Sequence, residues 1–261
     1  MKNLKPIALL LFVVFTMTSC LDFLRERVEG SGNVIKKEDY NINGFSKISI
    51  ATGINAYVKM GDTESILVEA DDNILELIRV EIAGDELSVY LDAKIGDYKK
   101  MDVYITTKEL EAVKASSGAN VDVEGVVNAE KLFCKASSGA NIEISANVTN
   151  FEGDASSSGQ INIGALTANK ATLEMSSGAA ISIENGAAEN LNVRASSAGN
   201  LRAYNVEAQT CDADASSGGS ININVIKTLL AEASSGGNVN FKGSPSIEKM
   251  STSSGGSINK Q

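Results

Sequence analysis

A short stretch of small, polar residues recurs eight times between residues 115 and 257 and constrains the fold more than any other feature. It reads ASSGAN at 115–120 and again at 136–141, and looser copies such as ASSSGQ and ASSGGS follow. Successive copies begin 18 to 21 residues apart. A self-similar period of about twenty residues predicts a solenoid in which every repeat forms one coil. The first serines of the copies are Ser116, Ser137, Ser156, Ser176, Ser196, Ser216, Ser234 and Ser253.

Alternating hydrophobicity on both sides of each copy indicates strands. In LNVRA at 191–195, every second residue is apolar, and β-branched pairs such as Ile142 and Ile144 follow the serines. A period of two with β-branched residues is typical of strands. The serine-rich stretch is then a corner between two strands, where glycine permits the positive φ that a sharp bend needs. Because glycine comes one position later at Gly159 and Gly199, we expect the corner to tolerate a local change of conformation there.

These features predict an all-β fold, a right-handed parallel β-helix with about twenty residues per coil. The leucine frame of leucine-rich repeats is missing, and the variable step argues against the strict hexapeptide period of left-handed β-helices. Coils stacked ~4.8 Å apart would spread the eight copies over roughly 34 Å. Small residues form an inward row before the corners, here named the alanine ladder: Ala115, Ala136, Ala155, Met175, Ala195, Ala215, Ala233 and Thr252.

We interpret residues 33–114 as the cap of residues 115–261, the β-helix proper. The stretch ATGINAYV at 51–58 matches SSGANVDV at 116–123, an offset of 65 residues that corresponds to about three longer coils. Between them we expect a short helix at 72–78, a hairpin with its turn at Gly84-Asp85, and a strand at 101–107.

The first residues are typical of an export signal. Two lysines precede the apolar stretch IALLLFVVF at 7–15, and Cys20 follows two small residues. This pattern predicts a lipoprotein signal peptide at 1–19, lipidation of Cys20 and a flexible tether within 20–32. The alternatives are an ordinary signal peptide and a short membrane anchor. With the lipid in a membrane, we expect an outer-membrane lipoprotein of the cell envelope, either periplasmic or surface-exposed.

Composition excludes several classes of function. The 261 residues contain no histidine, carry a formal net charge of −10 and include only 5 % aromatic residues. Histidine is the commonest general base and a common metal ligand, and an acidic chain is poorly suited to nucleic acids. Platforms that could stack sugars are also scarce. We therefore expect no enzyme activity, cofactor, metal site or nucleic-acid partner.

The two cysteines of the repeat region are not expected to pair. Cys134 and Cys211 fall in the second and sixth coils, which places them ~19 Å apart along the axis. A disulfide requires a far shorter distance. We expect both to be free, buried and structural.

Several segments together resemble one known family. These are the lipidation motif, GSGNV at 30–34, INGFSKISIATGINAYV at 42–58, LVEADDNILELI at 67–78 and the serial SSGAN-type corners. The chain resembles, over residues 30–261, the head GIN domain family of auto-transporter-type adhesins, common in Bacteroidetes. The resemblance implies a β-helical domain exposed at the cell envelope, and it assigns no ligand and no catalytic residue.

A charged row is expected to face outward two positions before each corner. In it, Arg194 stands between Glu174 and Asp214, one coil away on either side. Exposed pairs of this kind contribute ~0–1 kcal/mol each. They could instead be the acid–base groups of a polysaccharide lyase or hydrolase. We favour the first interpretation, because no long inserted loop is evident that would form the wall of a cleft.

Amide side chains follow most of the corners and form our candidate interaction face. Such amides could bond along the axis, bind calcium between coils, or contact a glycan or protein; carboxylates become rare after Glu143, which argues against calcium. We expect a non-enzymatic adhesion or interaction surface. The alternative is a structural or stress-related envelope spacer without a specific ligand, and the oligomeric state stays open. The candidate residues are Asn120, Asn141, Asn162, Asn222 and Asn240.

Overall fold

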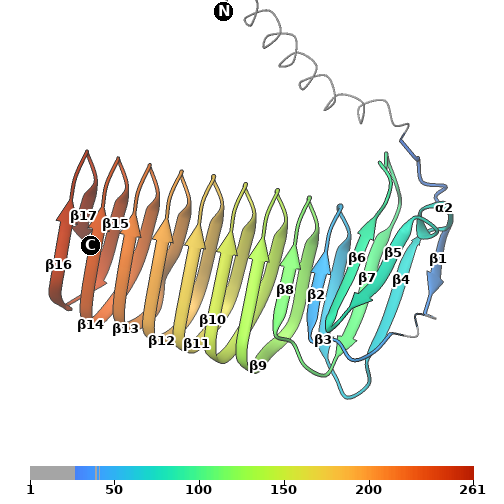
Figure 1. Cartoon of the computed structure of the whole chain (residues 1–261), viewed down its shortest axis with the longest axis horizontal. Coiled ribbons are helices and arrows are strands. Elements are labelled where there is room, and N and C mark those ends of the chain that lie inside the picture. The colour runs from blue at the N-terminus through green and yellow to red at the C-terminus, as the bar shows by residue number, and fades with distance from the viewer. Residues whose placement is uncertain (1–26, 39, 41) are drawn as a thin grey trace, which may run out of the picture.

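The structure is a computed structural model that describes residues 27–38, 40 and 42–261. Figure 1 shows a flattened solenoid whose coils stack side by side, with tight corners along one edge and wider bends along the other. The predicted all-β, parallel β-helix is confirmed. The predicted signal peptide, Cys20 and the first part of the tether lie outside the described residues. Among the residues that are described, no helix combines the length and the apolar character needed to cross a membrane.

Each coil consists of a strand that enters a corner and a strand that leaves it. Equivalent residues of successive coils pair in parallel, so that the alanine ladder is continuous from Ala115 to Thr252. Isoleucine, leucine and valine fill most inward positions after the corners and are buried in every coil but the last. The coils are built from β8 (Ala112–Ala115), β9 (Asn120–Ala136), β10 (Asn141–Ala155), β11 (Gln160–Met175), β12 (Ala180–Ala195), β13 (Asn200–Ala215), β14 (Ser220–Ala233), β15 (Asn238–Gly243), β16 (Ser246–Thr252) and β17 (Ser257–Lys260).

The corner is a type I′ turn that is repeated in every coil. In the first copy Ser117 has φ 53° and Gly118 has φ 75°, and the Ala119 N–H donates to the Ser116 carbonyl over 3.1 Å. Two central residues with positive φ and this bond define the turn. Neighbouring corners are also bonded to each other, because the Gly118 N–H donates to the Ser138 carbonyl over 3.1 Å. The eight predicted serines all stand at the first position of these turns.

The corner does not change its conformation in the two copies where glycine is displaced, so this expectation is wrong. Ser158 and Ala198 stand at the third position with φ 62°, as glycine does elsewhere. Their N–H groups still donate to the next coil. The stacking bond between corners thus holds non-glycine residues in the left-handed region, which costs them roughly 1–2 kcal/mol.

Ala198→Gly is therefore expected to raise the free energy of unfolding by about 1 kcal/mol, because glycine takes positive φ without that cost. Gly118→Ala is the matched control. A Cβ at Gly118 would meet nothing within 4 Å, so it should lower stability by about 1 kcal/mol through backbone conformation alone. Urea unfolding measures both changes. A change of the same sign in both variants would contradict the explanation.

The cap contains one further coil and two small extensions of the sheets. The further coil consists of β2 (Lys47–Ile50) and β3 (Asn55–Met60), and its corner has Thr52 and Gly53 at positive φ. β3 pairs directly with β9, with Asn55 beside Asn120. The offset of 65 residues is therefore a single step between neighbouring coils, and the expectation of about three coils is wrong.

The residues inside that step extend the two sheets of the solenoid. The entry sheet, formed by strands that precede corners, begins with β5 (Ile78–Ala83) and β6 (Glu86–Leu91) beside β2. The exit sheet, formed by strands that follow corners, begins with β1 (Val34–Lys37), β4 (Ser65–Asp71) and β7 (Met101–Thr107) beside β3. The predicted hairpin and strand 101–107 are confirmed. The predicted helix is shorter, since α2 spans only Asp72–Leu75.

The predicted tether is in part bonded to the cap. The Val28 N–H donates to the Lys94 carbonyl and the Gly30 N–H to the Asp97 carbonyl, over 2.9 and 2.8 Å. The buried carboxylate of Asp71 completes this attachment by accepting the N–H groups of Gly32 and Lys100, over 2.9 and 3.1 Å. Residues 28–32 thus belong to the folded domain, contrary to the prediction.

Candidate functional site

The predicted amide residues all lie outward on the exit sheet, in two adjoining rows. We call this surface the amide face. In the row nearer the corner, Asn120 pairs in register with Asn141; in the other, Asn222 pairs with Asn240. Ser182 and Arg202 stand between Asn162 and Asn222 in that second row. The structure therefore gathers the amides into two groups rather than one continuous stripe.

Most of these amides are bonded along the solenoid axis. The Nδ2 of Asn162 donates to Oδ1 of Asn141 over 2.8 Å, and the Nδ2 of Asn240 donates to Oδ1 of Asn222 over 3.1 Å. The Nδ2 of Asn120 donates to Oδ1 of Asn55 over 3.1 Å. Each such bond uses one donor and one lone pair, and an amide has two of each. The remaining groups are held at fixed positions on an open surface.

A stacked pair of tyrosines extends the amide face into the cap. Tyr57 of β3 pairs in register with Tyr104 of β7, and their ring centroids lie 5.2 Å apart with an interplanar angle of 19°. The side chain of Tyr57 remains 43 % exposed. The Asp102 carboxylate is the main cause that raises the pKa of the Tyr57 phenol, followed by burial. The Tyr57 phenol is therefore neutral at neutral pH, and the two stacked rings offer one apolar platform among polar groups.

Sequence reasoning missed this pair. The two tyrosines are 47 residues apart, and the pairing of β3 with β7 is not visible in the repeat. The one available signal was their alternation within predicted strands, which places both on an outward face.

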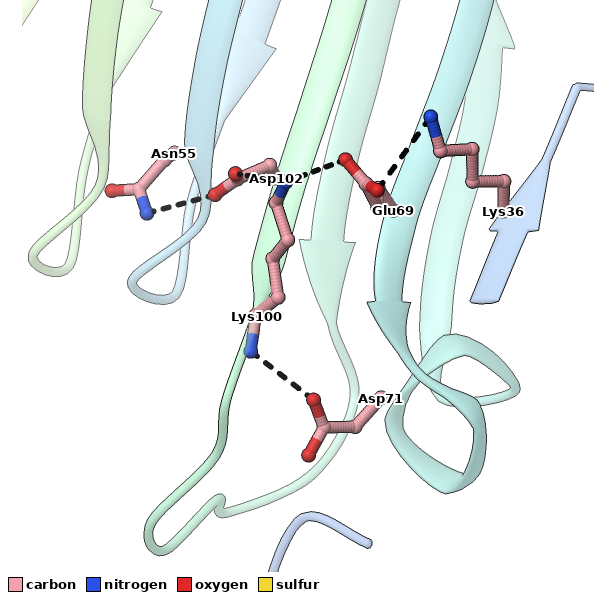
Figure 2. A network of polar contacts seen from close by, with 6 residues as sticks. All are labelled: Lys36, Asn55, Glu69, Asp71, Lys100 and Asp102. Atoms are coloured by element: carbon pink, nitrogen blue, oxygen red, sulfur yellow. Dashed lines mark hydrogen bonds and ion pairs between the residues drawn. The ribbon is translucent and has the colours of Figure 1, made fainter. Parts of the chain in front are cut away.

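A network of bonded polar groups lies beside the tyrosine pair, and Figure 2 shows its members Asn55, Glu69, Lys100 and Asp102. The ammonium of Lys100 lies 2.6 Å from Glu69 and 3.5 Å from Asp102. The hydrogen bond from Lys100 lowers the pKa of Glu69, and the same bond raises the pKa of Lys100. Asn55 donates to Asp102 over 3.1 Å and thereby joins this network to Asn120. Lys100 also lies 6.0 Å from the centroid of the Tyr104 ring.

The charged row of the entry sheet has the predicted register, and its arginine is paired. Arg194 lies 3.2 Å from Glu174, and both side chains are mostly exposed. An exposed pair of this kind stabilises the fold by ~0–1 kcal/mol. Its geometry gives no reason to assign Arg194 a catalytic role.

The expectation that nothing forms the wall of a cleft is wrong. The turn of the β5–β6 hairpin stands beside the entry sheet and encloses a groove of about 810 Å³, which we call the hairpin groove. Its floor runs over β8, β9, β10 and β11, and Phe133 is an aromatic side chain on its outward surface. The sequence did not reveal the groove, because the hairpin reaches these strands only through the long step between β2 and β8.

The cysteines are free and buried, as predicted. Burial raises the pKa of the Cys134 thiol to about 12, and burial is also the main cause that raises the pKa of Cys211. Both are thus protonated and unreactive at neutral pH. Within the part of the chain that the structure describes, no three His, Cys, Asp or Glu side chains are grouped so that they could hold a metal ion.

Comparison with solved structures places the same architecture in several proteins. Crystal structures named "putative adhesin" from Parabacteroides merdae and Parabacteroides distasonis match with TM-scores of 0.80 and 0.83, at 21 % and 20 % identity. Another from P. distasonis, named "Putative lipid binding protein", matches with a TM-score of 0.78 at 18 % identity. Each match covers 90 % of this chain and 99 % or more of the other. At such identities the likeness shows the fold alone.

A search of curated proteins finds no match. A family profile, by contrast, matches residues 44–245, from β2 through the stacked coils, and it is described as "Putative auto-transporter adhesin, head GIN domain". The matched range includes the ATGIN segment, the tyrosine pair and seven of the eight predicted corners. The chain therefore belongs to the head GIN domain family of auto-transporter-type adhesins.

Proposed function

We propose that this chain is a non-enzymatic interaction module of the cell envelope, of the adhesin class, anchored by a lipid on Cys20. Its amide face, together with the Tyr57–Tyr104 pair, would contact a glycan or protein at the cell surface. The observation that carries the proposal is the stacked tyrosine pair, in which Tyr57 is exposed and Tyr104 is half-buried, and which lies in the exit sheet beside a network of fixed hydrogen-bonding groups.

The physical case rests on rigidity and on the kind of groups exposed. Side chains that are already bonded to neighbouring coils lose little conformational entropy when a ligand binds. Amide groups offer both donors and acceptors, and an aromatic platform adds apolar contact area with a polar hydroxyl at its edge. Membership in an adhesin-class family supports the same function.

Binding is expected to weaken at least about ten-fold when both Tyr57 and Tyr104 are replaced by serine. The reason is the loss of aromatic contact area at an interface centre. The measurement is binding of the full chain to a glycan array and to a panel of matrix proteins. Asp214→Asn is the control, because Asp214 is exposed on the opposite sheet. Unchanged binding by the double variant would contradict the proposed contact surface.

A spacer without a specific ligand is the second candidate, and the bonds between the amides favour it. If the amides serve only to join coils, simultaneous replacement of Asn141, Asn162 and Asn222 by serine lowers the free energy of unfolding and changes no binding. If they contact a ligand, the same variant loses binding at temperatures where it is fully folded. Circular dichroism together with the binding panel separates the two results.

Cys20→Ser is expected to release the protein from the membrane fraction, because the lipid would have no attachment point. Cell fractionation followed by immunoblotting measures the change. Cys134→Ser is the matched control, since this residue is buried in the coils and should not affect anchoring. Protease added to whole cells then distinguishes a surface-exposed domain, which is digested, from a periplasmic one.

A catalytic role for Arg194 is tested by an assay of polysaccharide cleavage with the wild type and with Arg194→Ala. We expect neither the wild type nor Arg194→Ala to cleave acidic polysaccharides at a measurable rate. Turnover by the wild type that is abolished in Arg194→Ala would overturn the non-enzymatic assignment.

A further inference from the structure

The hairpin groove lies on the entry sheet, opposite the amide face, and it has a different chemistry. It crosses the strands from β2 to β11, so its long direction follows the solenoid axis. Four strand spacings of ~4.8 Å give it a length of ~19 Å. The floor is a hydrogen-bonded sheet and therefore rigid. An extended chain fits such a groove better than a compact ligand.

Two lysines of the groove are available for a ligand. Lys47 and Lys114 are occupied by the hairpin, at 2.8 Å from Asp85 and 2.6 Å from Glu86. Lys131 and Lys170 are exposed and form no ion pair with any described residue. They flank Asn150 in one row of the sheet, which places them ~9.6 Å apart.

Two carboxylates restrict what those lysines could bind. Glu111 and Glu152 also line the groove, and both are exposed without an ion pair among the described residues. They would repel a small compact anion that approached the lysines. Because a carboxylate can only accept hydrogen bonds, they suit a ligand that brings hydroxyl donors as well as negative charges.

Phe133 supplies the third element of the site. It points outward from the entry sheet between Ala112 and Glu152, at a row position where the next coils carry Glu152, Thr172 and Asn192. The inward positions on either side of it belong to the buried Leu132 and Cys134, so the core does not need this ring. The Phe133 ring is half-buried, and the part that faces the groove offers an apolar surface on which the C–H face of a sugar can stack.

We infer that the hairpin groove binds an extended acidic polysaccharide, a glycan that carries uronic-acid carboxylates. Its carboxylates would meet Lys131 and Lys170, its hydroxyls would donate to Glu111 and Glu152, and one sugar ring would stack on Phe133. The site is separate from the amide face and stands independently of the function proposed for that face.

The test is a binding titration of the full chain with oligosaccharides of alginate, polygalacturonate and hyaluronan. Carboxyl-reduced alginate and dextran serve as uncharged probes. At least one acidic probe is expected to bind, more weakly at higher salt, whereas the uncharged probes should bind at least about ten-fold more weakly. Lys131→Gln with Lys170→Gln, and separately Phe133→Ser, should each weaken acidic binding at least about ten-fold.

The control is Lys59→Gln with Lys227→Gln, which removes the same charge at exposed sites outside the groove. It should leave binding within about two-fold. No binding of any acidic probe, or equal loss in the control, would overturn the inference. A third result would also overturn the inference: the Tyr57→Ser, Tyr104→Ser variant no longer binds the acidic probes, while the groove variants bind them fully. That result would assign the ligand to the amide face.

Discussion

Phe151→Ala is expected to lower the free energy of unfolding by about 3–5 kcal/mol, the usual cost of removing a fully buried phenylalanine. Phe151 is among the largest fully buried side chains and points into the narrow interior from β10. Gly153, two residues later, faces the same interior with no side chain. A Cβ at that position would lie 3.3 Å from the Phe151 ring and 3.2 Å from both Leu173 and Ile181. The ring therefore occupies the space that Gly153 leaves.

This arrangement gives the experiment an internal control. Gly153→Ala alone is expected to destabilise through crowding, since its neighbours would have to move by a few tenths of an ångström. In the Phe151→Leu background the same change should cost less, because the smaller side chain relieves one of the three contacts. A double-mutant cycle measured by urea unfolding reports this coupling. Strict additivity would show that Phe151 does not fill the gap above Gly153.

Asp71→Asn is expected to cost about 2–3 kcal/mol at neutral pH, because hydrogen bonds to a charged group contribute more than neutral ones. The buried carboxylate accepts N–H groups from both the segment before β1 and the loop before β7. The side-chain amide of asparagine has the same shape, but its NH₂ group would face the backbone N–H donors. Asp92→Asn, at an exposed position, is the control and should change stability by less than about 0.5 kcal/mol.

The pH dependence of this effect has a definite sign. Burial by itself would raise the pKa of Asp71, but the N–H groups of Gly32, Lys99 and Lys100 outweigh it and the pKa is lowered. Because its pKa is lower in the folded state, the ionised Asp71 stabilises the protein at pH values above its unfolded pKa of about 3.9. This stabilisation is lost as the pH falls through the folded-state pKa. The stability difference between wild type and Asp71→Asn should thus be constant from pH 7 to 5 and shrink below pH 4. A difference that grows on acidification would contradict this account.

The repeat made the stacked coils predictable from the sequence. Each coil places its residues in the same environment as the one before, so alignment of the serines was enough to assign the alanine ladder from Ala115 to Thr252 and the burial of Cys134. The expectation for Ser158 and Ala198 was wrong because it followed the displaced glycine instead of this repetition. There, the bonds between neighbouring corners impose one conformation on residues that would avoid it in isolation.

The cap and both candidate surfaces were less predictable for one physical reason. Their geometry depends on pairings between segments that share no repeat, such as β3 with β7 and the hairpin with β2. The alternation of Tyr57 and Tyr104 placed them outward but could not place them side by side. Nor could the composition reveal the groove near Phe133, because its wall comes from a hairpin about 50 residues earlier in the sequence.

The long step between β3 and β9 has a consequence for the order of folding. Most coils close over about twenty residues, whereas the coil of β2 and β3 docks on β9 only after closure of a 65-residue loop. The longer loop costs about 1 kcal/mol more in chain entropy. We expect the serine-cornered coils to assemble first as a nucleus that grows by nearest-neighbour addition. Docking of the cap, and with it completion of both candidate surfaces, would then be the last kinetic phase.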